Sequence, residues 1–85
     1  MQKRLNKHLL RVGDLVVVTE HPETQVYTFA GLEGHTVMFQ WFEGSRHCSC
    51  GLDTDRLYQP TTQQIQYSIK ANGRLLAANE VLDWA

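Results

Sequence analysis

Residues 36–52 read TVMFQWFEGSRHCSCGL, and this stretch decides the fold. Aromatic and β-branched residues fill positions 36–42, a Gly-Ser pair stands at 44–45, and a second short run occupies 46–52. Two such runs around a two-residue loop that contains Gly are typical of a β-hairpin. Paired positions in an antiparallel hairpin sum to a constant, so a loop at 44–45 fixes the register. The predicted facing pairs are Glu43–Arg46, Trp41–Cys48, Phe39–Cys50 and Val37–Leu52.

A second hairpin is predicted on the N-terminal side of this stretch. The run at 25–32 is followed by Glu33-Gly34, and taking these two residues as the loop extends the sheet to a third strand. Earlier, the β-branched run at 15–19 lies between Gly13 and the turn at 21–23, and residues 56–58 can supply a short closing strand. The predicted core face then continues across the third strand through Val37–Ala30, Phe39–Thr28 and Trp41–Val26.

The same register predicts an opposite sheet face that is too apolar to be left in water. It pairs Phe29 with Met38 and Phe42 with His47, and it sets Tyr27 against Gln40. Something should cover this face, either a part of this chain or a partner. The predicted partner-binding residues are therefore Tyr27, Phe29, Met38, Phe42 and His47.

A helix is predicted after Pro60. Thr61 and Gln64 have the Thr-x-x-Gln spacing of a capping box, and Asn72-Gly73 is a stop signal. Ile65 and Ile69 lie one helical turn apart, although alternation with the aromatic residue at 67 leaves a strand as the competing interpretation. The apolar run after Arg74 predicts a second short helix. We divide the single domain, 1–85, into a basic N-terminal arm (1–12), a β barrel or meander (13–59) and a helical C-terminal tail (60–85).

Charge is divided unevenly along the chain. Eight Lys and Arg residues against nine Asp and Glu give a net charge of -1, yet the chain is basic before its first acid at position 14. A short basic arm can contact phosphates, so nucleic-acid binding is the alternative function. Four charges would limit the log-log salt slope of such binding to about -4. The residues concerned are Lys3, Arg4, Lys7 and Arg11.

Length and composition bound the fold class. Eighty-five residues that are 42% hydrophobic and 20% charged describe one small globular domain. No apolar run approaches the roughly 18 residues of a membrane span, and no secretory signal is evident. Two cysteines one residue apart cannot form a disulfide framework, which favours a reducing, cytoplasmic compartment. We expect a mainly β fold, α+β at the margin: an SH3-like small antiparallel barrel or meander of four to five strands with a C-terminal helix.

Two segments carry a resemblance to known families. Residues 11–16, Arg-Val-Gly-Asp-Leu-Val, resemble the opening strand of SH3-like barrels, in which a Gly-Asp turn leads into an apolar strand. Residues 56–65 are similar to small phage and plasmid accessory proteins of uncharacterised function, in which the last strand runs through a Pro-Thr cap into a short helix. The resemblance implies a fold and a bacterial mobile-element origin, and it implies no activity.

The motif His47-Cys48-Ser49-Cys50 has the residue types of a zinc site. In a strand, however, Cys48 and Cys50 point to one face and His47 to the other, and no second ligand pair exists in the sequence. We therefore expect core cysteines, no metal and no cofactor. Dispersed histidines and the absence of a nucleophile–base pair or a phosphate-binding glycine pattern argue against an enzyme. The predicted function is a noncatalytic protein-interaction module, with self-association included among its contacts.

Overall fold

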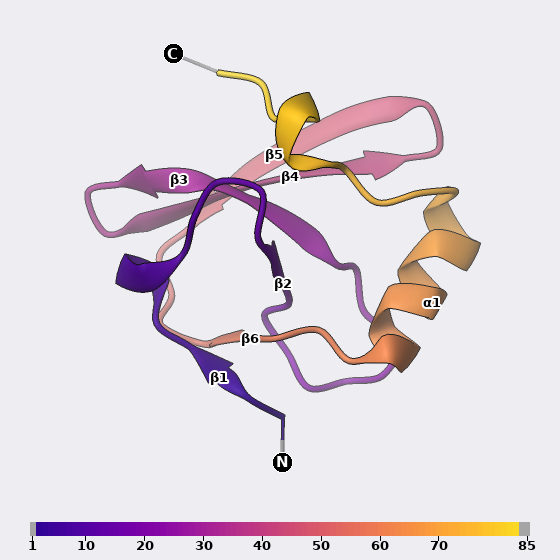
Figure 1. Ribbon diagram of the computed structural model, residues 1–85, viewed down its shortest axis with the longest axis horizontal. Coiled ribbons are helices and arrows are strands. Elements are labelled where there is room, and N and C mark those ends of the chain that lie inside the picture. The colour runs from indigo at the N-terminus through magenta and orange to yellow at the C-terminus, as the bar shows by residue number, and fades with distance from the viewer. Residues whose placement is uncertain (1, 84–85) are drawn as a thin grey trace.

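The computed structural model describes residues 2–83 and is mainly β, with two antiparallel sheets and one helix near the C-terminus (Figure 1). Strands β2 (Leu15–Val16), β3 (Tyr27–Glu33), β4 (Thr36–Glu43) and β5 (Arg46–Leu52) form the larger sheet in that order. Strands β1 (Arg4–Leu5) and β6 (Leu57–Tyr58) form the smaller one. The helix α1 spans Thr62–Asn72, and two 3-10 turns, η1 and η2, span Lys7–Leu9 and Ala78–Glu80.

The two sheets meet at one isolated bridge. Val17 exchanges two backbone hydrogen bonds with Tyr58, its N–H donating over 3.1 Å and its carbonyl accepting over 2.9 Å. The predicted meander is confirmed, but the strands do not close into a barrel: in the described chain, β5 has β4 as its only strand neighbour. With β1, β2 and β6 only two residues long, the N-terminal side of the fold has too little ladder to complete a ring.

The β4–β5 hairpin has the predicted register, from Glu43–Arg46 at the loop to Val37–Leu52 at the far end. Gly44 stands first in the two-residue loop with φ of 64°. A positive φ at that position is the requirement of a type II′ turn, and Gly meets it without a Cβ penalty.

The predicted register of β3 against β4 is wrong. The loop is at 34–35, not 33–34, so Glu33 pairs with Thr36, and a further shift between Phe29 and Gly31 brings Phe29 opposite Phe39. Gly34 has φ of 64° at the first loop position, as Gly44 has in the other hairpin. Because successive side chains alternate faces, the slip changes which residues share a face.

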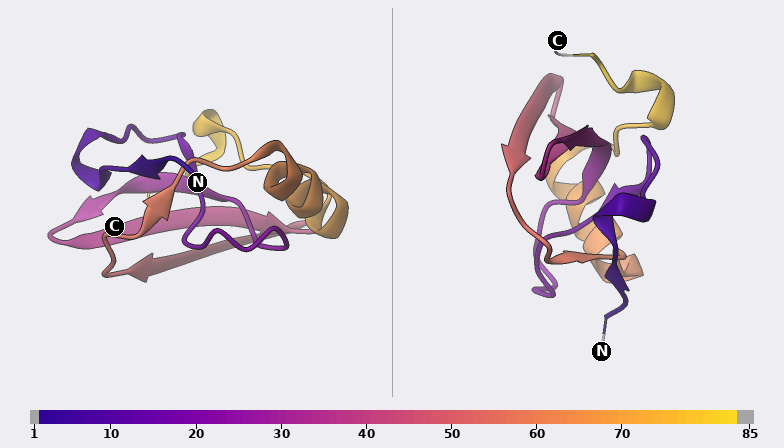
Figure 2. Two further views of the ribbon diagram at one scale, coloured as in Figure 1. Left: turned by 90° about the horizontal axis from the view of Figure 1, so that it is seen from below. Right: turned by 90° about the vertical axis from the view of Figure 1, so that its left-hand side faces the viewer.

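The main core lies between the larger sheet and the β1–β6 ribbon. Its buried members come from β2, β3, β4 and β6, and half-buried side chains from β1 and the loops surround them (Figure 2). Apolar burial of this kind supplies roughly 25 cal/mol per Å² removed from water. The buried cluster consists of Val16, Phe29, Val37, Phe39 and Leu57.

The helix begins and ends where the sequence predicts. Thr61 accepts from the Gln64 N–H at 3.1 Å while the Gln64 side chain accepts from the Thr61 N–H at 3.1 Å, which completes the capping box. The face that α1 buries is polar: Gln64 also donates to the Thr19 and His21 carbonyls, and Ser68 accepts from the Val26 N–H. The helix therefore binds the loop before β3 through hydrogen bonds. The predicted second helix is only the single turn η2.

Candidate protein-binding groove

The second sheet face is covered by residues 74–83, the part of the predicted tail that follows α1. From here on, the C-terminal tail means these residues. Leu76 is buried, and its carbonyl accepts from Thr28 Oγ1 on β3 at 2.5 Å. Arg74 stacks over the Phe42 ring at 4.0 Å and forms an ion pair with Glu80 at 2.6 Å. Of the two possibilities that the sequence left open, a part of this chain or a partner, the first holds, and the covering part is an irregular segment.

Gln40 on β4 fastens the far end of the tail. Its Nε2 donates to the Leu82 carbonyl at 2.5 Å, and its Oε1 accepts from the Leu82 N–H at 2.8 Å. An amide side chain presents one donor and one acceptor side by side, so Gln40 pairs with Leu82 as a neighbouring strand would. Only 1% of Gln40 is exposed, so these bonds form where water competes little.

His47 on β5 supports this clamp from the other side. Its Nε2 lies 2.8 Å from Gln40 Oε1, and its ring meets the Phe42 ring edge-on at 5.2 Å. The amide oxygen can only accept, so His47 donates from Nε2 in this arrangement. Gln40 is thus fixed by contacts on both sides, and no buried side-chain polar atom in the described chain lacks a partner.

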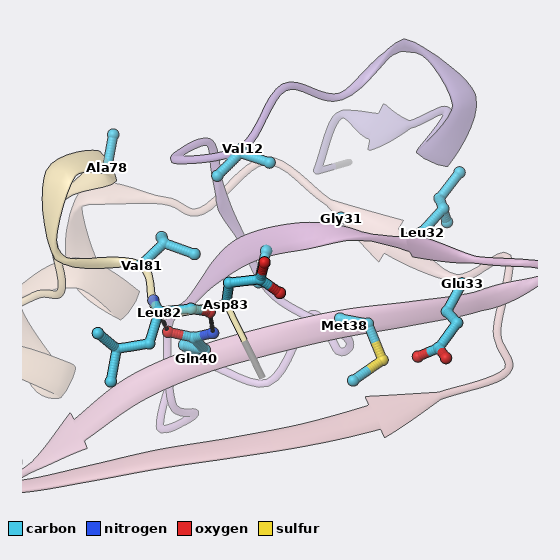
Figure 3. Close-up of a pocket in the computed structure, with 11 residues that line it drawn as sticks. Val12, Gly31, Leu32, Glu33, Met38, Gln40, Ala78, Val81, Leu82 and Asp83 are labelled. Carbon is cyan, nitrogen blue, oxygen red and sulfur yellow. Dashed lines mark hydrogen bonds between the residues drawn. The ribbon is translucent and has the colours of Figure 1, made fainter. Parts of the chain in front are cut away.

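A groove of about 580 Å³ lies between the β3–β4 hairpin and the C-terminal tail (Figure 3). One wall is formed by the hairpin, the other by η2 and the residues after it, and Val12 from the N-terminal loop closes one side. The lining is mainly apolar, although Glu33 and Asp83 add two carboxylates and Gln40 adds its amide. The lining residues are Val12, Ala30, Gly31, Leu32, Glu33, Met38, Gln40, Ala78, Val81, Leu82 and Asp83.

Two glycines shape this groove. Gly31 has φ of 130° at the irregular position of β3, and a Cβ there would meet open space, so the strand bends without filling the groove. Gly13 has φ of 104°, and a Cβ on it would lie 2.3 Å from the Ala78 Cβ. The N-terminal loop therefore approaches η2 closely only because residue 13 is Gly.

The electrostatics of the groove favour a neutral or positively charged occupant over one that carries phosphate. Its two acidic residues are accompanied by no Lys, Arg or His among the lining residues. A ligand that places an apolar group against Met38 and Leu32 would bring positive charge, if it has any, next to Glu33. Phosphate groups would be repelled by the same carboxylates.

The five predicted partner-binding residues do not share a face. Tyr27 lies beside Phe39 and Trp41 on the core side, with ring centroids 5.1 and 4.9 Å away, and Phe29 is buried there. Burial is the largest cause that raises the pKa of Tyr27, and the negative charges of the neighbouring Cys50 and Glu43 raise it further. Met38, Phe42 and His47 do belong to the second face. Of the three, Met38 lines the groove, Phe42 is buried beneath Arg74, and His47 supports Gln40.

The four predicted nucleic-acid residues belong to a docked segment, not to a free arm. Lys7 is buried, donates to the His35 carbonyl at 3.0 Å and pairs with Asp55 at 3.0 Å. The hydrogen bond from Lys7 lowers the pKa of Asp55, and the Lys7 charge adds to it. Arg4 lies on β1 and reaches the Asp55 carbonyl at 3.4 Å. Lys3 and Arg11 have exposed side chains, and the Lys3 carbonyl accepts from the Gln59 N–H.

Cys48 and Cys50 share one face of β5 and His47 takes the other, as the alternation predicts. The expected core position is wrong: Cys48 is half-buried and Cys50 is exposed, because the β1–β6 ribbon does not extend under β5. Neighbouring groups still desolvate the thiol enough to raise the pKa of Cys50. Within residues 2–83, no three His, Cys, Asp or Glu side chains are grouped so that they could hold a metal ion.

Sequence reasoning missed the residues that build the groove, above all Gln40 and the tail. One signal was present: Gln40 interrupts the run VMFQWF, and a polar side chain in a buried strand needs a hydrogen-bonding partner. The partner itself is the backbone of residue 82, which no sequence pattern identifies.

Comparison of the chain with protein-family models, with curated proteins and with solved structures found no match. In the part of the chain that the structure describes, no helix is long and apolar enough to cross a membrane.

Proposed function

We propose that this chain is a noncatalytic protein-interaction module that binds an apolar segment of a partner protein in the groove beneath the C-terminal tail. The observation that carries the proposal is a groove with apolar side chains exposed on both walls. Leu32 on the β3 wall is 37% exposed, and Leu82 on the tail wall is 49% exposed. Exposed apolar residues gathered around a groove are typical of sites that bind another macromolecule.

The shape and charge of the groove favour a peptide segment over the other ligand classes. A small-molecule site usually encloses most of its ligand, whereas Leu32 and Leu82 on the walls of this groove remain exposed. Its carboxylates at 33 and 83 oppose phosphates. The expected ligand is a partner segment with a large apolar side chain and a neighbouring Lys or Arg.

A random-peptide display selection against the purified protein tests this proposal. We expect the enriched peptides to combine an aromatic or aliphatic anchor with a basic residue. An enriched peptide is then synthesised with a fluorophore and titrated against two matched variants. Leu32→Lys changes the groove wall, and Leu9→Lys makes the same change at a side chain on η1 that is 79% exposed and outside the groove.

Leu32→Lys should weaken binding at least about tenfold, which corresponds to about 1.4 kcal/mol. The new ammonium both removes apolar contact and repels a basic ligand. Leu9→Lys should leave the affinity unchanged. Equal losses in both variants, no loss in Leu32→Lys, or a selection that enriches nothing over an unrelated control protein would each contradict binding in the groove.

Two finer expectations belong to the same proposal. A relationship to SH3-like barrels is supported by the Gly13-Asp14 turn that leads into β2 and by the meander of short antiparallel strands, here left open. The role of a cytoplasmic phage or plasmid accessory protein is supported by the Pro60-Thr61 cap that follows the last strand, β6, and begins α1. Neither expectation changes the chemistry of the groove.

A further inference from the structure

Strand β5 forms an outer edge of the larger sheet. Within residues 2–83 it pairs with β4 and with no other strand, and both views in Figure 2 place it at the margin of the molecule. All seven of its residues pair with β4 without a bulge. Ser49, Cys50 and Gly51 in its second half are exposed.

The backbone of β5 is set to accept another strand. The two-residue loop at 44–45 is closed by the pair Glu43–Arg46, whose backbone groups face each other across the turn. Antiparallel ladders alternate, so residues 48, 50 and 52 direct their N–H and C=O groups toward β4. Ser49 and Gly51 then direct theirs outward, where a further strand could bond to them.

The edge lacks the usual protection against strand addition. Natural edges are blunted by charged side chains, Pro, a bulge or a very short strand. β5 is seven residues long with no Pro and no bulge, and its one charged residue, Arg46, lies at the loop end. Its apolar side continues from Trp41 through Cys48 and Cys50 to Leu52, which is 43% exposed. A strand added here would extend that surface.

We propose that the occupant of this edge is a second copy of the chain, paired antiparallel about a two-fold axis through Ser49. In this register Ser49 faces itself, and Cys48 faces Cys50 of the partner subunit twice. Each facing pair in this register joins residues from the same face of β5. The core faces of both copies therefore lie on the same side of the continuous sheet. The contact is isologous, so it closes as a dimer and does not propagate.

Charge complementarity favours a second copy in this orientation. β5 begins at Arg46 and is followed at once by Asp53, and both residues are exposed. Antiparallel pairing brings the basic end of each strand next to the acidic end of the other. Parallel pairing would place like charges together.

The same register makes a cross-strand disulfide geometrically accessible. Positions 48 and 50 face each other as a pair that is not hydrogen-bonded across the new interface, with Cα atoms about 4.5 Å apart. Disulfides span Cα separations of about 4.4–6.8 Å. With oxidised glutathione as the oxidant, one thiolate attacks a glutathione sulfur and releases one glutathione thiol. The facing thiolate then attacks the cysteine sulfur of this mixed disulfide and releases the second glutathione. Two cysteine thiols and one oxidised glutathione thus give one protein disulfide and two reduced glutathiones.

Cross-linking with single-cysteine proteins tests the register. Cys48→Ser retains Cys50 alone, and Cys50→Ser retains Cys48 alone. Mixed together in oxidised glutathione, the two should give a covalent dimer at least roughly tenfold faster than either alone, because only the mixture places two thiols directly opposite each other. The products are resolved by non-reducing electrophoresis and intact mass.

Three outcomes would overturn the proposal. Cross-linking of either variant alone as fast as the mixture would show another register. A monomer of the unaltered protein that is two mass units lighter, with no covalent dimer, would show that the two cysteines pair within one chain. If the mixture cross-links no faster without urea than with added urea, β5 of one copy does not meet β5 of the other.

A charge pair at the axis tests the dimer without the cysteines. Ser49→Lys and Ser49→Glu each place like charges directly opposite each other, which destabilises a strand pair. Each variant alone should sediment as a monomer, and an equimolar mixture should recover the dimer. Ser49→Thr is the control and should dimerise like the unaltered protein. If Ser49→Lys dimerises as well as Ser49→Thr, the axis does not pass through Ser49.

Discussion

Gln40 shows how much of this molecule depends on one side chain. The residue lies within an apolar strand, yet it fastens the C-terminal tail by two hydrogen bonds to Leu82 and accepts a third from His47. The tail in turn forms one wall of the groove. The shape of the groove therefore depends on Gln40, which both lines it and fastens one of its walls.

Gln40→Ala should lower the free energy of unfolding by about 1–3 kcal/mol, because it removes the clamp and leaves buried polar groups without partners. The backbone amide of Leu82 should also exchange its hydrogen faster, since its acceptor is gone. Urea unfolding and hydrogen-exchange NMR measure the two effects. The control is Gln66→Ala on the exposed side of α1, which should change stability by less than about 0.5 kcal/mol. Unchanged exchange at Leu82 in Gln40→Ala would contradict the clamp.

The Lys7–Asp55 pair predicts a pH dependence of stability. Lys7 lowers the pKa of Asp55 in the folded state. The contribution of the Asp55 carboxylate to stability is therefore fully present above its unfolded-state pKa of about 3.9, and it is lost as the pH falls through its folded-state pKa. Asp55→Asn should therefore melt below the unaltered protein at pH 7, and the two melting temperatures should converge as the pH falls below about 4.

Differential scanning calorimetry between pH 7 and pH 2 measures this convergence. Glu23→Gln serves as the control, because Glu23 is an exposed acid in the loop before β3, away from Lys7 and from β5. If the melting temperatures of Asp55→Asn and the unaltered protein differ by the same amount from pH 7 to pH 2, the Asp55 carboxylate is not held by Lys7.

At the scale of elements, the two hairpins show what sequence can and cannot predict. The segments around the loops are alike: Glu33-Gly34-His35 and Glu43-Gly44-Ser45 each place Gly after an acid. The β4–β5 register was predicted because Gly44 was taken as the first loop residue, and the β3 register failed because Gly34 was taken as the second. Both glycines have φ of 64° at the first loop position, so the same turn chemistry applied to both hairpins would have placed the loop correctly.

Other elements divide by whether their signals are local. The helix cap at Thr61 and the stop at Gly73 were predicted because a capping box and a C-terminal Gly are read within a few residues. The position of the tail over the sheet was not predicted, since it is set by Leu76 and Leu82 contacting strands more than 40 residues earlier. The register shift after Phe29 is permitted by Gly31 with its φ of 130°, but a Gly inside a strand does not by itself fix where a register changes.

At the scale of the whole molecule, one of the basic side chains that the sequence places in the N-terminal arm forms an ion pair within the fold. Lys7 pairs with Asp55, which leaves three of the four predicted nucleic-acid residues, Lys3, Arg4 and Arg11, exposed at the surface. β1 also ties the start of the chain to β6. These contacts reduce the support for the nucleic-acid alternative.

A backbone amide NMR titration with a DNA duplex and a single strand measures what the exposed charges can do. We expect weak binding at low salt and a log-log salt slope no steeper than about -2.7, the limit for three charges. Shifts should be confined to residues 3–11 and should disappear at higher salt. A slope near -4 would require Lys7 to leave Asp55 and would favour the alternative function.

The pairing of β1 with β6 bears on how the chain assembles during its synthesis. The hairpins of β3, β4 and β5 involve neighbouring segments, so they can form while the ribosome is still extending the chain. Residues 4 and 5 must wait for residues 57 and 58, and the sheet face around Gln40 waits for residue 82. Residues 4 and 5 are thus synthesised well before their partners and are among the last to pair. Until then the nascent chain exposes an unpaired strand, a state in which chaperones and neighbouring nascent copies have access to it.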